Sequence, residues 1–243
     1  MQTKSFRIDR YISKKCNINR RDIKLMLAQG RIVINGDVIR EITTIVEEFD
    51  HVLLDDELLQ DKQAVYIMMH KPIGVVSATK DELHTTVIEL LPDELMCEDL
   101  HIVGRLDLNT SGLLLLTNDS RWSKKLMSPE AKVSKVYQVT LENELTAEYV
   151  SAFAEGMYFS FEDITTQPAE LTILTERVAE VILKEGKYHQ IKRMFGRFRN
   201  PVVALHRSAV GSLLLDESLG AGDSRSLTSN EVSAIFNAQK VDD

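Results

Sequence analysis

A short polar segment between apolar residues constrains the fold of this chain most. Apolar residues 102–103 lead into Gly104-Arg105-Leu106-Asp107, the loop-forming residues 109–112 follow, and a run of four leucines (113–116) leads out. This pattern predicts a strand, a short polar loop and a second strand that is buried on both faces. Asp107 then lies where the loop leaves the core, partly removed from water. Its carboxylate stays ionised there only if a cation or hydrogen-bond donors compensate for the lost hydration.

A carboxylate in such a position is either reactive or simply bonded to its own turn. One residue alone leaves both interpretations open, but the surrounding string carries more information. Gly104-Arg105-Leu106-Asp107, then residues 110–114 (Thr-Ser-Gly-Leu-Leu) and 117–119 (Thr-Asn-Asp), resemble the catalytic motif of the pseudouridine synthases. The form is that of the ribosomal small-subunit enzymes and their large-subunit relatives. The resemblance extends over nearly the whole chain.

The first part of the chain predicts a small domain of two short helices and a hairpin. Apolar residues recur at helical spacing in two stretches, Asn19 is a candidate N-cap for the second helix, and Gly30 ends it. Asn35-Gly36 then separates two β-rich runs, which is a strong hairpin signal. Two helices and a hairpin, with basic residues on the helices, resemble the S4 RNA-binding domain.

The charge of the chain is unevenly distributed. The net charge of −8 argues against a general nucleic-acid binder, yet residues 1–40 carry +7 and the remainder −15. A basic arm on an acidic body indicates that the N-terminal part meets a polyanion, rather than presenting a solvated helix face. The S4-like resemblance implies that the RNA contacts come from five basic residues: Arg7, Arg10, Arg20, Arg21 and Lys24.

Residues 55–63 are polar and acidic, which predicts a linker. We therefore expect an S4-like RNA-binding domain over residues 1–60 and a second domain over residues 61–243. The mixture of strands and amphipathic helices in the second part predicts an α+β fold. The resemblance specifies a pseudouridine synthase catalytic domain, with a mixed, largely antiparallel sheet flanked by helices.

Two further features lie near the start of the second domain. Lys71-Pro72 begins a Lys-Pro-x-Gly string that recurs at this place in the family, and we interpret it as mainly structural. The family usually has Asn before the lysine, whereas this chain has His70, to which we assign no role. Thr86 through Leu91 predicts a short helix that Pro92 stops.

The resemblance implies that three groups meet in one cleft. Asp107 is the catalytic carboxylate, Tyr137 stacks on the target uracil, and a basic residue from the motif Tyr188-His189-Gln190-Ile191-Lys192-Arg193-Met194 pairs with the carboxylate. We place that basic residue on Lys192, with Arg193 as the second choice and an RNA contact. Arg105 is expected to occupy the space that the target base leaves. On spacing alone, a tyrosine in an alternating strand such as Tyr137 is usually a core or rim residue, and Lys192 and Arg193 also fit the surface charges of a helix.

The same motif bears on the substrate. Several large-subunit relatives carry Asn-Arg-Gln where this chain has Tyr188-His189-Gln190. We therefore expect a single uridine of 16S rRNA as the substrate, in an assembling small-subunit particle, with a 23S rRNA uridine as the alternative. A non-catalytic ribosome-assembly RNA-binding protein would have no use for Asp107. A glycoside hydrolase would need a second, paired carboxylate, and the sequence signals only one.

Neither metal nor cofactor is expected. The chain has two cysteines without Cys-x-x-Cys spacing, no His-x-x-x-His pair and no glycine-rich phosphate loop. Pseudouridine synthases, which the chain resembles, use no cofactor. The absence of a signal-like start and of a long apolar run predicts a cytoplasmic protein that does not associate with membranes. We expect it to be a monomer.

Overall fold

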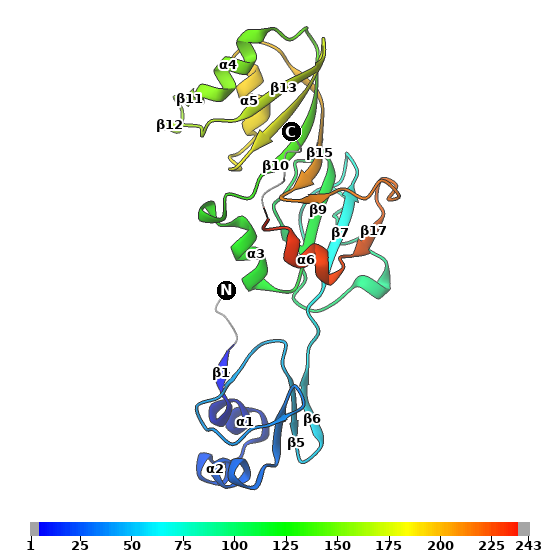
Figure 1. The fold of residues 1–243 in the computed structure, drawn as a ribbon. Coiled ribbons are helices and arrows are strands. Elements are labelled where there is room, and N and C mark those ends of the chain that lie inside the picture. The colour runs from blue at the N-terminus through cyan, green and yellow to red at the C-terminus, as the bar shows by residue number, and fades with distance from the viewer. Residues whose placement is uncertain (1–4, 238–243) are drawn as a thin grey trace. The chain divides into compact units, whose positions relative to one another are not determined.

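The computed structural model describes residues 5–237, and its contacts divide the chain into two units, Met1–Ala64 and Val65–Asp243 (Figure 1). The division falls after residue 64 rather than after residue 60. The predicted linker is wrong, because residues Glu57–Asp61 form strand β6, which pairs with β5 (His51–Leu54) inside the first unit. β6 is an edge strand, and charged residues are common on such edges because they prevent further pairing. That polar composition gave the strand the appearance of a linker.

The first unit contains the two predicted helices and the predicted hairpin. Asn19 caps the second helix by accepting a hydrogen bond from the backbone N–H of Asp22 at 3.0 Å, and Gly30 ends it with φ +73°. Asn35 and Gly36 both have positive φ, as a two-residue hairpin turn requires. In chain order, the elements of this unit that precede β5 are β1 (Phe6–Arg7), α1 (Ile8–Cys16), α2 (Arg20–Gln29), β2 (Ile32–Ile34), β3 (Asp37–Val38) and β4 (Ile45–Val46). The two predicted helices are α1 and α2, and the predicted hairpin is β2 with β3.

The second unit is built on one large sheet. Its strands are β7 (Tyr66–Lys71), β8 (His101–Val103), β9 (Ser111–Thr117), β10 (Lys135–Leu141), β13 (Glu170–Thr175), β14 (Val178–Leu183), β15 (Val202–Val210), β16 (Leu213–Leu214) and β17 (Ser224–Ser226). The central order is β13-β14-β10-β15-β9-β7-β17, with β16 beside β15 and β8 beside β9. Every one of these pairings is antiparallel except β15 with β9, which is parallel. The predicted α+β fold with a mixed, largely antiparallel sheet is confirmed.

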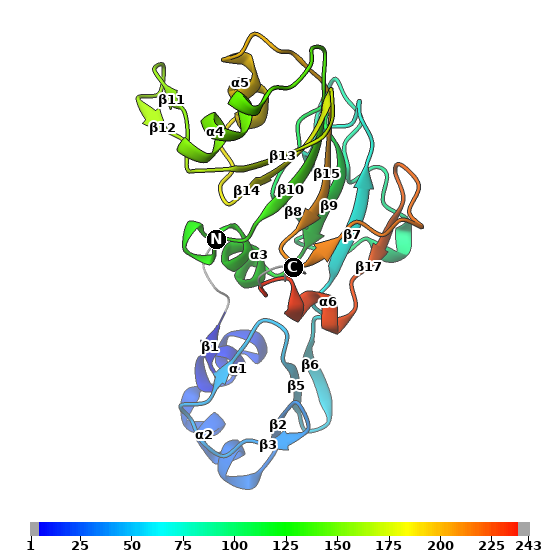
Figure 2. The same ribbon diagram turned by 45° about the horizontal axis from the view of Figure 1, so that its top comes forward.

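Helices cover both ends of this sheet (Figures 1 and 2). They are α3 (Ser120–Met127), α4 (Ala147–Glu155), α5 (Gln190–Gly196) and α6 (Ser229–Ala234), with short 3₁₀ turns at Asp93–Leu95 and Pro129–Ala131 and a small hairpin of β11 (Tyr158–Phe159) and β12 (Ile164–Thr165). Phe153 of α4 and Phe195 of α5 pack ring to ring at 4.8 Å over Val139 and Val181 of the sheet. This packing fixes α5, which carries the predicted basic motif, against β10 and β14.

The four-leucine run is buried on both faces, as predicted. Leu113 and Leu115 pack in one apolar cluster with Trp122 of α3, whereas Leu114 and Leu116 pack in another with residues of the β7–β8 connection. Strand β9 is therefore an interior strand that is covered on both faces of the sheet. The polar loop that precedes it rests on the rigid end of that strand.

The helix predicted over Thr86–Leu91 is wrong. Val76 and Thr86 form an isolated bridge, and the residues that follow make a turn in which the Leu91 N–H bonds to the Ile88 carbonyl at 3.1 Å. Six residues before a proline are too few to sustain a helix without strong support from packing. Across residues 5–237, no helix combines the length and the apolar character needed to cross a membrane.

Candidate active site

The loop between β8 and β9 is held by hydrogen bonds to its backbone at several positions. The Ser77 hydroxyl accepts from the Leu106 N–H at 3.1 Å and donates to the Leu106 carbonyl at 2.8 Å. The Gly74 N–H donates to the Leu108 carbonyl at 2.8 Å, and the Lys71 ammonium donates to the Thr110 carbonyl at 2.9 Å. These bonds fix the backbone on both sides of Asp107, so its carboxylate is presented from a rigid frame.

Lys71 is fully buried beneath this loop. Its Nζ lies between the carbonyl oxygens of Pro72, at 2.8 Å, and Thr110, at 2.9 Å. Burial lowers the pKa of Lys71 to about 8; the nearby Asp107 carboxylate opposes this shift, and Arg207 adds to it. The lysine ties β7 to the end of the loop, which is the structural role expected from its sequence.

A buried arginine holds the backbone on both sides of the loop. Arg207 is 2% exposed and donates from Nη2 to the Gly104 carbonyl and from Nε to the Leu113 carbonyl, both at 2.8 Å. It lies where β15 meets β9 in parallel, opposite Gly112. The string Leu205-His206-Arg207 resembles the small-subunit enzymes, but the sequence alone assigned Arg207 no role. Its function depends on a pairing between strands that are distant in sequence.

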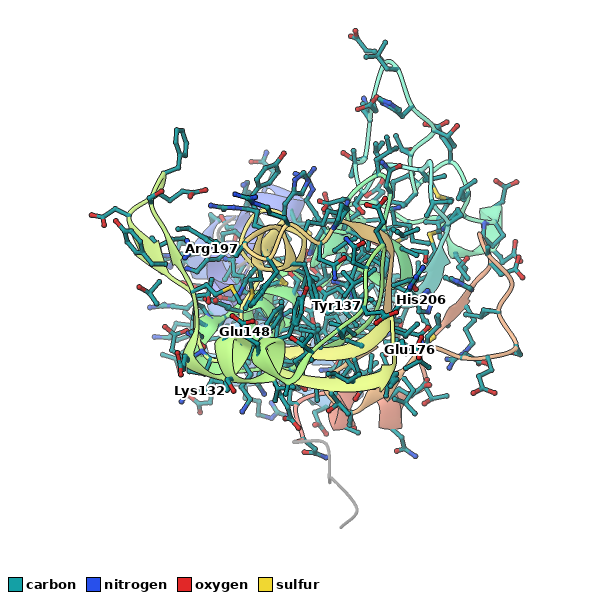
Figure 3. All side chains as sticks on the ribbon, turned by 90° about the horizontal axis from the view of Figure 1, so that it is seen from above. Lys132, Tyr137, Glu148, Glu176, Arg197 and His206 are labelled. Atoms are coloured by element: carbon teal, nitrogen blue, oxygen red, sulfur yellow. The ribbon has the colours of Figure 1, made fainter. Side chains whose placement is uncertain are left out.

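A pocket of about 110 Å³ opens beside Asp107. Its other lining residues are Arg105, Leu106, Thr110, Tyr137, Leu183, Gly186, Lys187, His189, Gln190, Ile191, Lys192 and Leu205. Figure 3 shows Tyr137 toward the centre of the view, whereas Lys132 lies near the edge. The structure thus brings together Asp107, Tyr137, Lys192 and Arg105, four of the residues that the sequence had indicated.

The Asp107 carboxylate is 35% exposed and has two basic neighbours. Lys192 Nζ lies 3.9 Å from Asp107 Oδ2, and His189 Nε2 lies 3.2 Å from the same oxygen. Both side chains come from the start of α5 and the residue just before it. The carboxylate therefore lies between the ammonium of Lys192 and the imidazole of His189.

Arg193 points elsewhere. Its guanidinium pairs with Glu162 and lies 3.9 Å from the ring centroid of Phe159 in β11. Adjacent residues on a helix project about 100° apart, so only one of the pair Lys192 and Arg193 can face the pocket. The geometry places Lys192 beside Asp107 and Arg193 on the side of α5 that faces the small hairpin.

His189 is the pocket residue that sequence reasoning left without a role. Its backbone adopts the left-handed region with φ +48°, which is uncommon for a residue other than glycine. This conformation is found where the chain enters α5, and the imidazole there lies beside Asp107. No composition or spacing signal reports such a local backbone conformation.

Thr110 contributes a buried hydroxyl to the same pocket. Within the described residues, its Oγ1 has no hydrogen-bond partner. Residues 5–237 also contain no group of three or more His, Cys, Asp or Glu side chains arranged to hold a metal ion. The pocket lining itself offers a carboxylate, a phenol, an imidazole, an amide, a hydroxyl and cationic side chains.

The basic residues of the first unit fall into two groups. Arg7 and Arg20 both bind the buried carboxylate of Asp9, with Arg7 Nη2 at 3.0 Å and Arg20 Nε at 2.8 Å. Burial alone would raise the pKa of Asp9, but the hydrogen bonds from Arg20 and Arg7 outweigh it and hold that pKa below its usual range. Arg10, Arg21 and Lys24 are exposed and project into solvent.

Comparison with known proteins identifies the family. The model of the RNA pseudouridylate synthase family matches residues 65–196, which include every lining residue of the pocket except Leu205. The chain belongs to this family. Ribosomal small subunit pseudouridine synthase A of Pseudomonas aeruginosa is 46% identical, over 94% of this chain and 100% of its own length.

Further members of the family also match this chain over nearly its full length. The protein of the same description from Escherichia coli K12 is 35% identical over 94% of this chain and 99% of its own length. A solved structure described as a pseudouridylate synthase is 35% identical, covers 95% of this chain and 99% of its own, and superposes with a TM-score of 0.68. The RNA pseudouridylate synthase fold therefore extends through the second unit, and the resemblance includes the first unit as well.

Proposed function

We propose that this protein converts one uridine of 16S rRNA to pseudouridine. The observation that carries the proposal is the Asp107 carboxylate, held in a pocket that also contains Tyr137 and Lys192. The relatives described as small subunit pseudouridine synthase A support the choice of RNA, because they align with this chain over nearly its full length. The motif Tyr188-His189-Gln190, in place of the Asn-Arg-Gln of several large-subunit relatives, supports the same choice.

The reaction needs one ionised carboxylate beside the sugar. Isomerisation breaks the bond between C1′ and N1, turns the uracil and joins its C5 to C1′; N1 gains a proton and C5 loses one, so no co-reactant is consumed. Breaking the first bond leaves positive character on the sugar, as in glycoside hydrolysis. Asp107 either adds to C1′ or takes the 2′ proton to give a glycal. Both routes begin from the ionised carboxylate.

The neighbours of Asp107 each supply one part of this chemistry. Lys192, with its Nζ 3.9 Å from Asp107 Oδ2, pairs with the carboxylate that reacts. Tyr137 holds the detached uracil against its ring while the base turns. Arg105 is exposed at the rim and fills the gap in the RNA stack when the uridine leaves it, which offsets part of the few kcal/mol that unstacking costs.

The first unit acts as the RNA-binding domain. Its exposed cations Arg10, Arg21 and Lys24 contact phosphates, and Arg7 and Arg20 add their remaining exposed surface while they hold Asp9. Arg193, which belongs to α5, adds a further contact with the RNA. The enzyme works as a monomer in the cytoplasm on 16S rRNA in an assembling small-subunit particle.

The test is to map pseudouridine after incubating the protein with RNA that lacks it. Undermodified 30S particles, free 16S transcript and 23S transcript are each treated with the wild type, with Asp107→Asn and with the control Asp93→Asn. Asp93 is exposed, belongs to the same unit and does not line the pocket. Carbodiimide adducts at pseudouridine are then located by primer extension.

We expect one new stop in 16S rRNA with the wild type and with Asp93→Asn, and none with Asp107→Asn. A stop in 23S rRNA alone would move the protein to the large-subunit enzymes. The absence of a stop in either RNA, with binding intact, would replace catalysis by a role in ribosome assembly. A stop that persists with Asp107→Asn would remove Asp107 from the mechanism.

A further inference from the structure

An exposed aromatic ring lies next to the pocket and is stacked on one of its lining residues. The ring of Tyr188 lies over the imidazole of His189, with centroids 3.9 Å apart and planes 20° from parallel. Tyr188 is nevertheless 75% exposed, so most of its ring is uncovered within residues 5–237. An exposed, flat apolar surface of this kind offers a π-face to an incoming ring.

The segment that carries Tyr188 is fixed rather than loose. The buried Gln190 side chain accepts from the Lys187 N–H at 3.0 Å and donates to Glu185 Oε1 at 2.7 Å. On the other side of Tyr188, the His189 imidazole lies 3.2 Å from Asp107 Oδ2. A ring held in this way loses little conformational freedom when it binds a partner, so more of the stacking energy appears as affinity.

The size of the pocket determines what must lie outside it. A volume of about 110 Å³ is well below the few hundred Å³ of a usual small-molecule site, so it takes one base and not two. When the target uridine enters, the neighbouring nucleotides remain on the surrounding surface. They have also lost the stacking partner that the uridine provided.

We propose that Tyr188 is a stacking platform for a nucleobase that flanks the target uridine. The inference rests on the proposed function, since it assumes that the pocket receives a uridine from an RNA strand. Lys187, Lys192 and Arg105 line the adjacent pocket and attract the phosphates of that strand. Aromatic stacking beside such cations is how proteins hold unpaired RNA.

Another exposed aromatic residue fits this role less well. Phe161 is 95% exposed between β11 and β12, but it is followed directly by Glu162 and Asp163 and does not line the pocket. Acidic neighbours repel an RNA strand. Phe161 therefore serves as a control: it is an exposed aromatic ring of the same unit that does not line the pocket, and the Arg193 guanidinium beside Glu162 is already paired with that carboxylate.

The experiment compares Tyr188→Ala, Tyr188→Phe and Phe161→Ala. Kinetic constants are measured in the wild-type background on the undermodified 16S rRNA substrate. The Kd is measured for the same RNA in the Asp107→Asn background, where no turnover occurs. We expect Tyr188→Ala to raise Kd and KM by about 5- to 150-fold with kcat within twofold, since stacking of one base contributes at this level. We expect Tyr188→Phe to match its parent, because a phenyl ring keeps the π-face. We expect Phe161→Ala to match its parent as well, because Phe161 does not line the pocket.

Three results would overturn the platform. They are a Kd for Tyr188→Ala within twofold of its parent, a Tyr188→Phe variant as weak as Tyr188→Ala, and a loss confined to kcat, which would mean that Tyr188 acts only through His189. The failure of the proposed function has a different signature. In that case the wild type forms no pseudouridine, while the Kd comparison still reports whether Tyr188 binds RNA.

Discussion

The backbone of Arg207 lies so close to Gly112 that a Cβ on the glycine would be 2.3 Å from the Arg207 carbonyl oxygen. Gly112 also has φ +110°, a conformation that side chains rarely adopt. Since the site loop enters β9 here, we expect Gly112→Ala to lower the free energy of unfolding by about 3 kcal/mol or more. Urea unfolding followed by the fluorescence of Trp122, the single tryptophan, measures this in the second unit.

Gly74→Ala is the matched control for this prediction. Gly74 has φ +81°, but among the described atoms none lies within 4 Å of the position its Cβ would take. Only the left-handed backbone is penalised there, so the expected loss is about 1–2 kcal/mol. If the two variants lost the same stability, the close approach to Arg207 would not be what requires glycine at position 112.

Lys192 and Arg193 are adjacent, and their different surroundings predict different effects on catalysis. Lys192→Met removes the cation beside Asp107, and we expect kcat to fall by about 100- to 1,000-fold. Arg193→Met removes the pairing with Glu162 and the contact with Phe159, so we expect kcat to change by less than about 10-fold. Single-turnover conversion of undermodified 16S rRNA measures both. The reverse order would place the catalytic cation on Arg193.

The part of the site that follows from local pattern could be predicted from the sequence. Loop-forming residues between an apolar strand and four leucines predicted the Asp107 loop and a buried β9. This was possible because turn formation and burial depend on the residue types within one short stretch of sequence. The choice between Lys192 and Arg193 stayed open, since the sequence does not say how a helix is rotated against its sheet. The contact of His189 depends on a left-handed backbone and could not be anticipated.

The other features that the sequence did not predict depend on pairing between strands. The role of Arg207 requires β15 to lie parallel to β9, and nothing in either strand encodes its partner. The stretch Glu57–Asp61 has the composition of a linker, yet it pairs with β5 as an edge strand. Edge strands are difficult to recognise because the polar residues that protect them also occur in linkers.

The buried ammonium of Lys71 predicts a pH-dependent stability. Burial lowers its pKa to about 8 in the folded protein, against about 10.5 in an unfolded chain. Between these values the unfolded chain binds more protons at this residue, so stability rises with pH. Relative to Lys71→Met, the wild type should gain about 3 kcal/mol between pH 8 and pH 10.5. Urea unfolding of both proteins across this range measures the gain, and a constant difference would contradict a buried, titrating lysine.

Arg225 predicts a pH dependence of the same sign in the acid range. Its guanidinium binds both oxygens of Glu231, at 3.0 and 2.7 Å, and Asp216 Oδ2 at 2.6 Å, which joins β17 to α6. Hydrogen bonds from Arg225 lower the pKa of Glu231 to about 2. The pKa of Asp216 is also lowered to about 2, mainly by hydrogen bonds from Ser218 and to a smaller extent by the hydrogen bond from Arg225. A lowered carboxyl pKa contributes stability above its unfolded value, and this contribution is lost as pH falls toward the folded value.

We therefore expect the wild type to exceed Arg225→Met in stability most at pH 5–7, and this difference to shrink steadily as the pH approaches 2. Trp122 reports on this region directly, because its Nε1 donates to the Val232 carbonyl of α6 at 3.1 Å. Urea midpoints from its fluorescence, taken from pH 3 to pH 7, measure the trend. Arg177→Met, which removes an exposed arginine from the β13–β14 turn, should show a difference that is small and independent of pH. If Arg225→Met gave the same flat profile, the stability of α6 would rest on its Thr228–Glu231 capping box and not on Arg225.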